Sequence, residues 1–269
     1  MFKKRIVSFA LAAYLMASGL PVFADDANTA KVFDKSELGS GVISVRYDNT
    51  TNVKRKLMVQ KGDKTYYYNL QSEDRFPLQF GNGEYTVAVM ENVKDNKYKL
   101  VAKETLRLEL ENPNEVFLKS MKLVQWNDEM ESIKKAKELT KDAKTDNEKV
   151  MAIYSYIIHN VSYDYDKITG LTTDYVPVID ETLAAETGIC YDFASLFAAM
   201  LRSVDVPTKL IMGYKNNIDV YHAWNQVYLK ATDEWITVDT TYDSILYHSG
   251  EEAFSWNKDA QEYTVEKLY

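Results

Sequence analysis

The stretch GICYDFASLFAAMLR (residues 188–202) decides how the second half of the chain is interpreted. Its apolar positions recur at helical spacing, which predicts a helix that starts near Cys190 and ends before Pro207. A thiol at a helix start meets unpaired backbone N–H groups and the positive end of the helix dipole, and both stabilise a thiolate. The same N–H groups can stabilise an oxyanion. Cys190 is therefore a candidate nucleophile, and the alternative is an inert, buried thiol.

The elements around this helix indicate an α+β domain. Thr145 and Glu148 have the spacing of a capping box, and the apolar face that follows over residues 150–161 predicts a second helix. Residues 129–141 carry mixed charge and predict a surface helix. Three strand-like runs come last, and they cover residues 208–214, 221–229 and 235–240. Helices followed by strands, rather than an alternation of the two, favour an α+β arrangement.

A nucleophilic thiol needs a base, and the base needs a group that orients it. His222 opens the strand 221–229, where an imidazole can reach a helix N-terminus packed on the sheet. Asp239 falls mid to late in the next predicted strand, and a carboxylate inside an apolar strand needs a partner because an unpaired buried charge is costly. His159 is explained by a helix C-terminus, and His248 lies in a predicted loop. The sequence thus suggests a triad of Cys190, His222 and Asp239.

These residues stand in blocks that resemble the transglutaminase-like superfamily over roughly residues 145–245. The blocks are residues 188–202, Val206 to Tyr214, His222-Ala223-Trp224-Asn225, Trp235 to Thr241, and the upstream segments 153–157 and 161–166. The resemblance implies a papain-like fold with Cys190 as nucleophile, His222 as base and then acid, and Asp239 as the orienting group. It also implies a protein or peptide substrate, with a cell-wall peptide among the candidates.

The resemblance leaves the reaction open. A thioester at Cys190 can pass to water, which gives peptide or amide hydrolysis, or to an amine, which gives glutamine transamidation. A non-catalytic cell-envelope binding protein is the third alternative. Tyr163 and Tyr175 are weak candidates for a second oxyanion donor. No spacing of calcium or zinc ligands is present, so no metal and no cofactor is expected.

The first half of the chain has a period of two rather than 3.6. Alternating runs between Gly41 and Leu110, with turn signals at Gly62-Asp63, Gly81-Asn82-Gly83 and 94–97, predict a small antiparallel β-sandwich over residues 41–112. Asn112-Pro113-Asn114 breaks the pattern, and the transglutaminase-like domain is placed at residues 116–269. The three tyrosines 66–68 suggest carbohydrate binding only weakly, because neighbouring strand residues point to opposite faces.

Composition and the first residues bear on the location of the protein. The 269 residues include 40 acidic and 32 basic side chains, which argues against a nucleic-acid binder, and the single cysteine excludes an internal disulfide. A basic start, an uncharged stretch to Leu20 and small residues up to Ala24 are typical of a signal peptide over residues 1–24. The stretch is short for a bilayer span. We expect a secreted or envelope-associated protein without a membrane span after cleavage, in which residues 25–40 form a linker.

Overall fold

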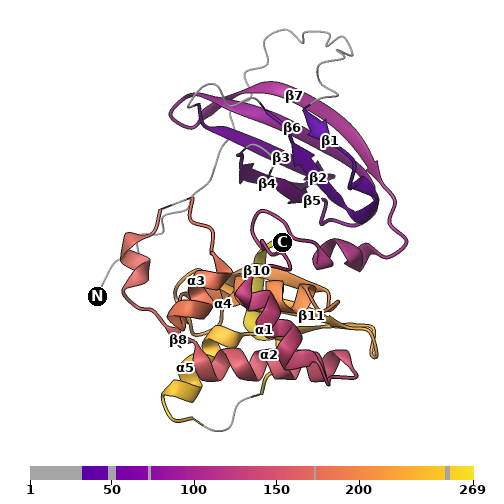
Figure 1. Cartoon of the computed structure of the whole chain (residues 1–269). Helices are drawn as coiled ribbons and strands as arrows, with labels where there is room; N and C mark the ends of the chain where they lie inside the picture. The colour runs from indigo at the N-terminus through magenta and orange to yellow at the C-terminus, as the bar shows by residue number, and fades with distance from the viewer. Residues whose placement is uncertain (1–31, 48–52, 72–73, 173, 252–254) are drawn as a thin grey trace.

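The computed structural model describes residues 32–47, 53–71, 74–172, 174–251 and 255–269. These residues form two parts, an all-β part and a mixed part of helices and strands, which lie one above the other in Figure 1. The signal peptide predicted at residues 1–24 lies outside the described residues. Within them, no helix has both the length and the apolar content needed to cross a bilayer.

The first part is an antiparallel β-sandwich, as the alternating sequence predicts. One sheet has the strand order β1-β2-β5 and the other has the order β4-β3-β6-β7. The strands are β1 (Phe33–Asp34), β2 (Val42–Val45), β3 (Arg55–Lys61), β4 (Lys64–Asn69), β5 (Arg75–Pro77), β6 (Gly83–Lys94) and β7 (Lys97–Leu108). Both sheets contribute to one core, in which Ile43 and Phe76 from one sheet pack with Leu57 and Val87 from the other. The inward positions of each strand are the apolar ones, which is why the two sheets close on each other.

The turn signals and the linker had different outcomes. The hairpin between β3 and β4 turns at Gly62, and the hairpin between β6 and β7 turns at Asp95, which has a φ of 52°. Both turns lie where the sequence predicts them. The prediction of a linker at residues 25–40 is wrong for the residues of this segment that the structure describes. Phe33 of β1 pairs with Val45 of β2 and is buried in the sandwich core. A single inward aromatic residue in a short polar segment was too weak a pattern to predict a strand.

The second part is an α+β domain with a four-stranded antiparallel sheet of order β12-β11-β10-β13. Its strands are β10 (Thr208–Lys215), β11 (His222–Leu229), β12 (Glu234–Val238) and β13 (Tyr263–Leu268), with a small parallel pair of β8 (Ser162–Tyr163) and β9 (Thr187–Gly188). The helices are α1 (Glu131–Thr140), α2 (Asp146–Asn160), α3 (Ile179–Ala185), α4 (Cys190–Arg202) and α5 (Thr240–His248). Short 3-10 turns lie at Leu38–Ser40, Pro113–Leu118, Lys167–Gly170 and Ala260–Glu262.

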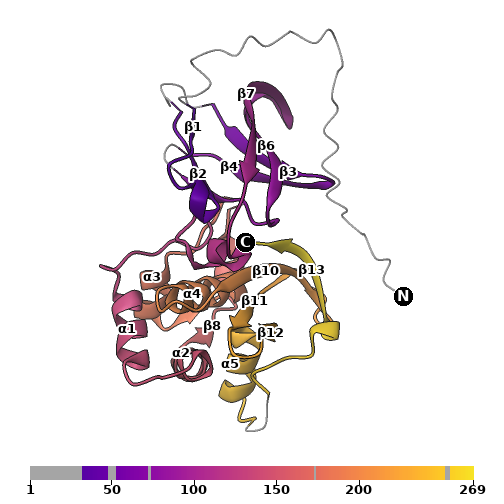
Figure 2. The same ribbon diagram turned by 90° about the vertical axis from the view of Figure 1, so that its right-hand side faces the viewer.

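Helix α4 is the centre of this domain. It packs on β10 and β11 on one side and on α1 and α2 on the other (Figure 2). All of its residues from Asp192 to Arg202 are buried, so the helix is enclosed on every face and not only along the predicted apolar stripe. Helix α2 has the predicted capping box, in which Thr145 Oγ1 accepts from Glu148 N and Thr145 N donates to Glu148 Oε2, each at 3.2 Å.

The third predicted strand is too long at its C-terminal end. Strand β12 ends at Val238, and Asp239 is the N-cap of α5 rather than a strand residue. A carboxylate readily accepts hydrogen bonds from the free N–H groups of a helix start. Asp239 therefore caps α5 instead of extending the pairing of β12 with β11. Helices α3 and α5 and strand β13 are not predicted by the sequence pattern, and His248, which is predicted to lie in a loop, is the last residue of α5.

The two parts meet around Tyr269, at the label C in Figure 1. Its ring packs edge-on against Tyr66 and Tyr68 of β4, with ring centroids 5.5 and 5.8 Å apart. Its carbonyl oxygen accepts from Arg202 Nη2 at 3.1 Å, and Arg202 also donates to the carbonyl oxygens of Lys119 and Thr208. The buried guanidinium therefore joins the end of α4 to β13 and to the segment that leaves the sandwich.

Candidate active site

The local fold places Cys190 at the first residue of α4, as predicted, with its side chain half-buried. Gly188 precedes it in β9, and a side chain there would collide with Asp192, since a Cβ atom would lie 2.7 Å from Asp192 Cβ. Glycine at this position thus lets the chain turn sharply from β9 into the helix. The backbone N–H groups of the first helical turn lie next to the thiol and carry the positive end of the dipole.

Strand β11 brings His222 to the same place. Asn225 of this strand donates from Nδ2 to Ala194 O in α4 at 3.0 Å and to Lys209 O in β10 at 3.1 Å. This amide fixes the register of the helix against the sheet. His222, three residues earlier in β11, then lies beside the N-terminus of the helix, and its ring and Cys190 line the same cavity.

Asp239 holds the imidazole from the far side. Its Oδ2 lies 2.8 Å from His222 Nε2 and accepts from Tyr263 Oη at 3.1 Å, while its Oδ1 accepts from Tyr242 N at 3.0 Å. The carboxylate is fully buried. One aspartate therefore caps α5 and orients the histidine, and Nδ1 of His222 is the ring nitrogen left for the thiol.

The pair is charged in the folded protein. Burial lowers the pKa of His222, but the charge and hydrogen bond of Asp239, with a contribution from Cys190, outweigh it and raise the pKa to about 10. Burial raises the pKa of Asp239, but His222, the Tyr242 amide and the Tyr263 hydroxyl outweigh it, so this pKa lies below its ordinary value. At neutral pH the structure thus places an imidazolium beside Cys190 and a carboxylate behind the ring.

A cluster that the sequence pattern does not predict lies next to Cys190. The buried Asp192 carboxylate accepts from Ile189 N at 2.8 Å, from Lys167 Nζ at 2.7 Å and from Tyr175 Oη. The sequence feature that could have indicated this role is the position of Asp192, three residues after the helix N-cap. Acidic residues at this position accept hydrogen bonds from backbone N–H groups of the helix start. Tyr175, one of the two tyrosines considered for the oxyanion, has its hydroxyl proton committed to Asp192.

The other tyrosine stays a candidate. Tyr163 lines the cavity that holds Cys190 and His222, and burial together with the nearby Cys190 raises its pKa to about 12. Its hydroxyl thus remains protonated across the physiological range and is available as a donor. The cavity has a volume of about 670 Å³, within the range of roughly 300–1,000 Å³ that is usual for ligand sites.

The remaining histidines lie away from this cavity. The ring of His159 packs against Tyr247, with centroids 4.3 Å apart, and that of His248 contacts the same tyrosine from the end of α5. In the part of the chain that the structure describes, no group of three His, Cys, Asp or Glu side chains has an arrangement that could hold a metal ion.

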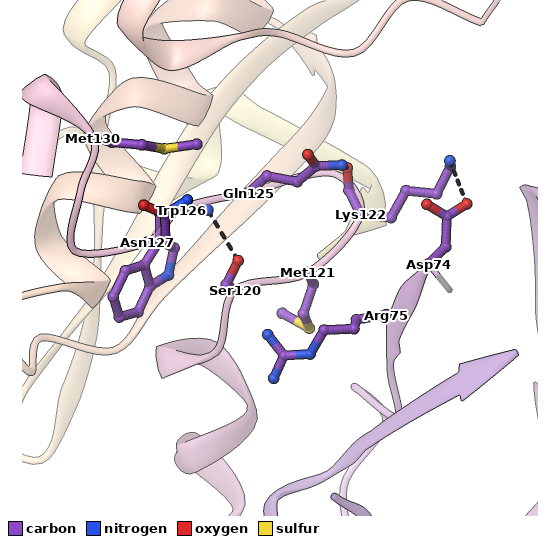
Figure 3. A pocket seen from close by; sticks show the side chains of 9 residues that line it. All are labelled: Asp74, Arg75, Ser120, Met121, Lys122, Gln125, Trp126, Asn127 and Met130. Atoms are coloured by element: carbon purple, nitrogen blue, oxygen red, sulfur yellow. Dashed lines mark hydrogen bonds and ion pairs between the residues drawn. The ribbon is translucent and has the colours of Figure 1, made fainter. Parts of the chain in front are cut away.

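A second cavity of about 280 Å³ lies at the junction of the two parts (Figure 3). Its charged side chains have partners: Lys122 Nζ lies 2.6 Å from Asp74 Oδ2, and Arg75 pairs with Glu37. Ser120 Oγ accepts from Trp126 N at 2.9 Å. The Lys122–Asp74 pair holds the connecting segment to the sandwich, so the cavity belongs to the junction and not to the thiol site.

Comparisons with known proteins identify the family of the part that carries this site. Residues 133–240 match the family model described as the transglutaminase-like superfamily. Residues 133–240, which lie within the second part, thus form a transglutaminase-like domain. The match contains Cys190, His222 and Asp239, and it leaves the β-sandwich outside.

Curated relatives of the transglutaminase-like domain carry the name kyphoscoliosis peptidase. The human protein is 30% identical over 119 residues, which are 40% of this chain and 18% of the relative. The mouse protein is 28% identical over 129 residues, or 44% and 19% of the two chains. The chain therefore spans less than a fifth of the length of these relatives.

Solved structures that resemble the chain include two bacterial proteins. A candidate cysteine protease from Cytophaga hutchinsonii is 17% identical, with 85% of this chain and 82% of that chain covered and a TM-score of 0.41. The periplasmic domain of TgpA from Pseudomonas aeruginosa is 16% identical, with 80% and 95% covered and a TM-score of 0.38.

Proposed function

We propose that the protein is a cysteine-dependent hydrolase of peptide or amide bonds that acts through a thioester at Cys190. The observation that carries this proposal is the geometry of one site: a half-buried thiol at the start of α4, an imidazole beside it, and Asp239 2.8 Å from the imidazole Nε2. A positive imidazolium and a helix N-terminus both favour the thiolate, which is the reactive form. The relatives named as peptidases support the same chemistry.

In the proposed reaction the Cys190 thiolate attacks the carbonyl carbon of the substrate amide. The backbone N–H groups at the start of α4, with Tyr163 as a candidate second donor, stabilise the oxyanion that forms. His222 gives its proton to the leaving amine, the C–N bond breaks and a thioester remains. Neutral His222 then takes a proton from water, which attacks the thioester and releases the acid and the free thiol.

The test uses the fact that the chain has a single cysteine, so that any thiol label reports on Cys190 alone. We expect iodoacetamide to label the native protein at neutral pH and to abolish its cleavage of a mixed peptide pool. The variant Cys190→Ser should take no label and should cleave peptides at least about 10³-fold more slowly. Cleavage that survives in Cys190→Ala would reject the assignment.

A fluorescent amine added to the same assay separates hydrolysis from transfer. Hydrolysis predicts release of the acid or of ammonia without incorporation of the amine. Incorporation into a glutamine donor would instead show a transamidase, and a native thiol that neither reacts nor turns over would favour a binding protein. The signal peptide predicted at residues 1–24 implies that the reaction takes place outside the cytoplasm. Export of the protein stays a prediction.

A further inference from the structure

The β-sandwich forms one wall of the cavity that contains the thiol. Strand β4 is the edge strand of its sheet and the strand of that sheet nearest to the transglutaminase-like domain in Figure 1. Tyr67, Tyr68 and the following Leu70 line the cavity together with Cys190 and His222. A substrate that reaches the thiol through this cavity therefore touches both parts of the molecule.

Exposed apolar side chains gather around this cavity. Four large apolar residues that line it are exposed: Tyr67 (39%), Ile168 (51%), Val220 (63%) and Tyr221 (45%). They come from β4, from the 3-10 turn after β8 and from the residues before β11, so they are distant in sequence. Exposed apolar surface that converges on a cavity is typical of a binding site, because leaving it in water costs free energy.

Two basic residues of the cavity wall, Arg55 and Lys122, have an acidic partner. Arg55 pairs with Glu91 at 3.1 Å, and Lys122 pairs with Asp74 at 2.6 Å. Asp174 accepts a hydrogen bond from Asn69, which also ties the loop before α3 to β4. A substrate group thus meets neutralised pairs at Arg55 and Lys122, while Lys54 and Asp174 line the cavity without an ion pair among the described residues. Most of the remaining lining is apolar or aromatic, and this surface distinguishes one uncharged substrate side chain from another.

We propose that Tyr67 and Leu70 of the sandwich determine specificity, and that the substrate is a polypeptide segment with a large apolar or aromatic side chain next to the scissile amide. This inference rests on the proposed function. The segment enters between the two parts, its carbonyl carbon lies at Cys190, and the neighbouring side chain packs against the Tyr67 ring. The sandwich then selects the substrate while the transglutaminase-like domain performs the reaction.

The test compares full-length variants on paired peptides that differ only in having Phe or Gly on either side of the cleaved bond. We expect the native protein to prefer the Phe peptide and Tyr67→Ala to reduce the ratio of the two kcat/KM values about tenfold, with the Gly peptide little changed. Tyr67→Phe keeps the ring and should keep the preference. Tyr98→Ala is the matched control, since this half-buried tyrosine lies on β7 and lines neither cavity described above.

The outcomes separate the two proposals. Turnover with a Phe preference that Tyr67→Ala lowers and Tyr98→Ala leaves intact supports the inference. Turnover with an unchanged preference in Tyr67→Ala overturns the inference and leaves the proposed function standing. A native protein that cleaves no member of the peptide pool overturns the proposed function and this inference together.

Discussion

Asp239 has two roles that usually belong to separate residues. One carboxylate oxygen caps α5, and the other orients His222 and accepts from Tyr263. Three donors compensate a fully buried charge, which would otherwise be costly. Because cap and orienting group are one residue, the start of α5 and the position of the imidazole cannot change independently.

Tyr263→Phe tests the contribution of the third donor. The pKa of Asp239 is depressed in the folded protein, so its stabilising effect is present above the ordinary carboxyl pKa and is lost as the pH falls through the folded value. Loss of the Tyr263 hydroxyl raises that folded value. We expect a loss of about 1 kcal/mol at neutral pH and acid unfolding that begins at higher pH.

Urea unfolding between pH 2 and 7 measures this shift, and the acid limb of kcat/KM should move in the same direction. Tyr228→Phe is the matched control, because its hydroxyl bonds the exposed Asp233 at 2.5 Å on the hairpin after β11. An acid limb that is the same in Tyr263→Phe and in the native protein would show that the hydroxyl does not support Asp239.

At the scale of elements, strand β13 depends on one glycine of β10. The register of β10 and β13 shifts between Met212 and Gly213, and at this bulge the backbone of β13 approaches closely. A Cβ atom on Gly213 would overlap the carbonyl oxygen of Thr264 and would lie 3.0 Å from the Trp224 ring. Thr264 directly follows Tyr263, so this contact also sets where the Tyr263 hydroxyl lies.

We expect Gly213→Ala to destabilise the protein by about 1–3 kcal/mol, as overpacking does, and to lower kcat/KM by moving Tyr263 away from Asp239. Urea unfolding and peptide turnover measure the two effects. Gly39→Ala is the control, because among the described residues no heavy atom lies within 4 Å of the added Cβ. Equal stability of the two variants would contradict the close approach of β13.

At the scale of the whole molecule, the two parts are joined by buried contacts. These are the rings around Tyr269, the hydrogen bonds of Arg202, and the pair of Lys122 with Asp74, whose side chains are 8% and 11% exposed. We therefore expect one cooperative thermal transition. A β-sandwich that moved freely would not give the cavity at Cys190 a fixed wall.

Asp74→Ala leaves the buried Lys122 ammonium without this partner, which costs roughly 3 kcal/mol and should lower the Tm by about 5 °C or more. Scanning calorimetry measures the change. Asp128→Ala is the control, because its pair with Lys137 is 71% and 50% exposed and such surface pairs contribute little. Two resolved transitions in the native protein would contradict the coupling.

Local patterns were sufficient for much of this protein. The period of two predicted the sandwich, the capping box predicted the start of α2, and the apolar spacing after Cys190 predicted α4. Cys190 at a helix start, His222 at a strand start and Asp239 directly after a strand each have a local signal, and the fold brings the three to one site. The missed elements include β1, α3, α5 and β13. Few apolar residues are buried in each of them, and the buried residues of α5 are polar, so the apolar pattern is weak.

The sequence alone determined the class of each part, the identity of the nucleophile candidate and its position at a helix start, since these follow from contacts between near neighbours. Tertiary structure decided the rest: that Asp239 caps a helix while it holds His222, that Asp192 binds Lys167 and Tyr175, and that β4 forms a wall of the cavity. Each of these contacts joins residues far apart in the chain. No local sequence period predicts these contacts, because they form and stabilise the protein only after the sheets and helices of the two parts have packed together.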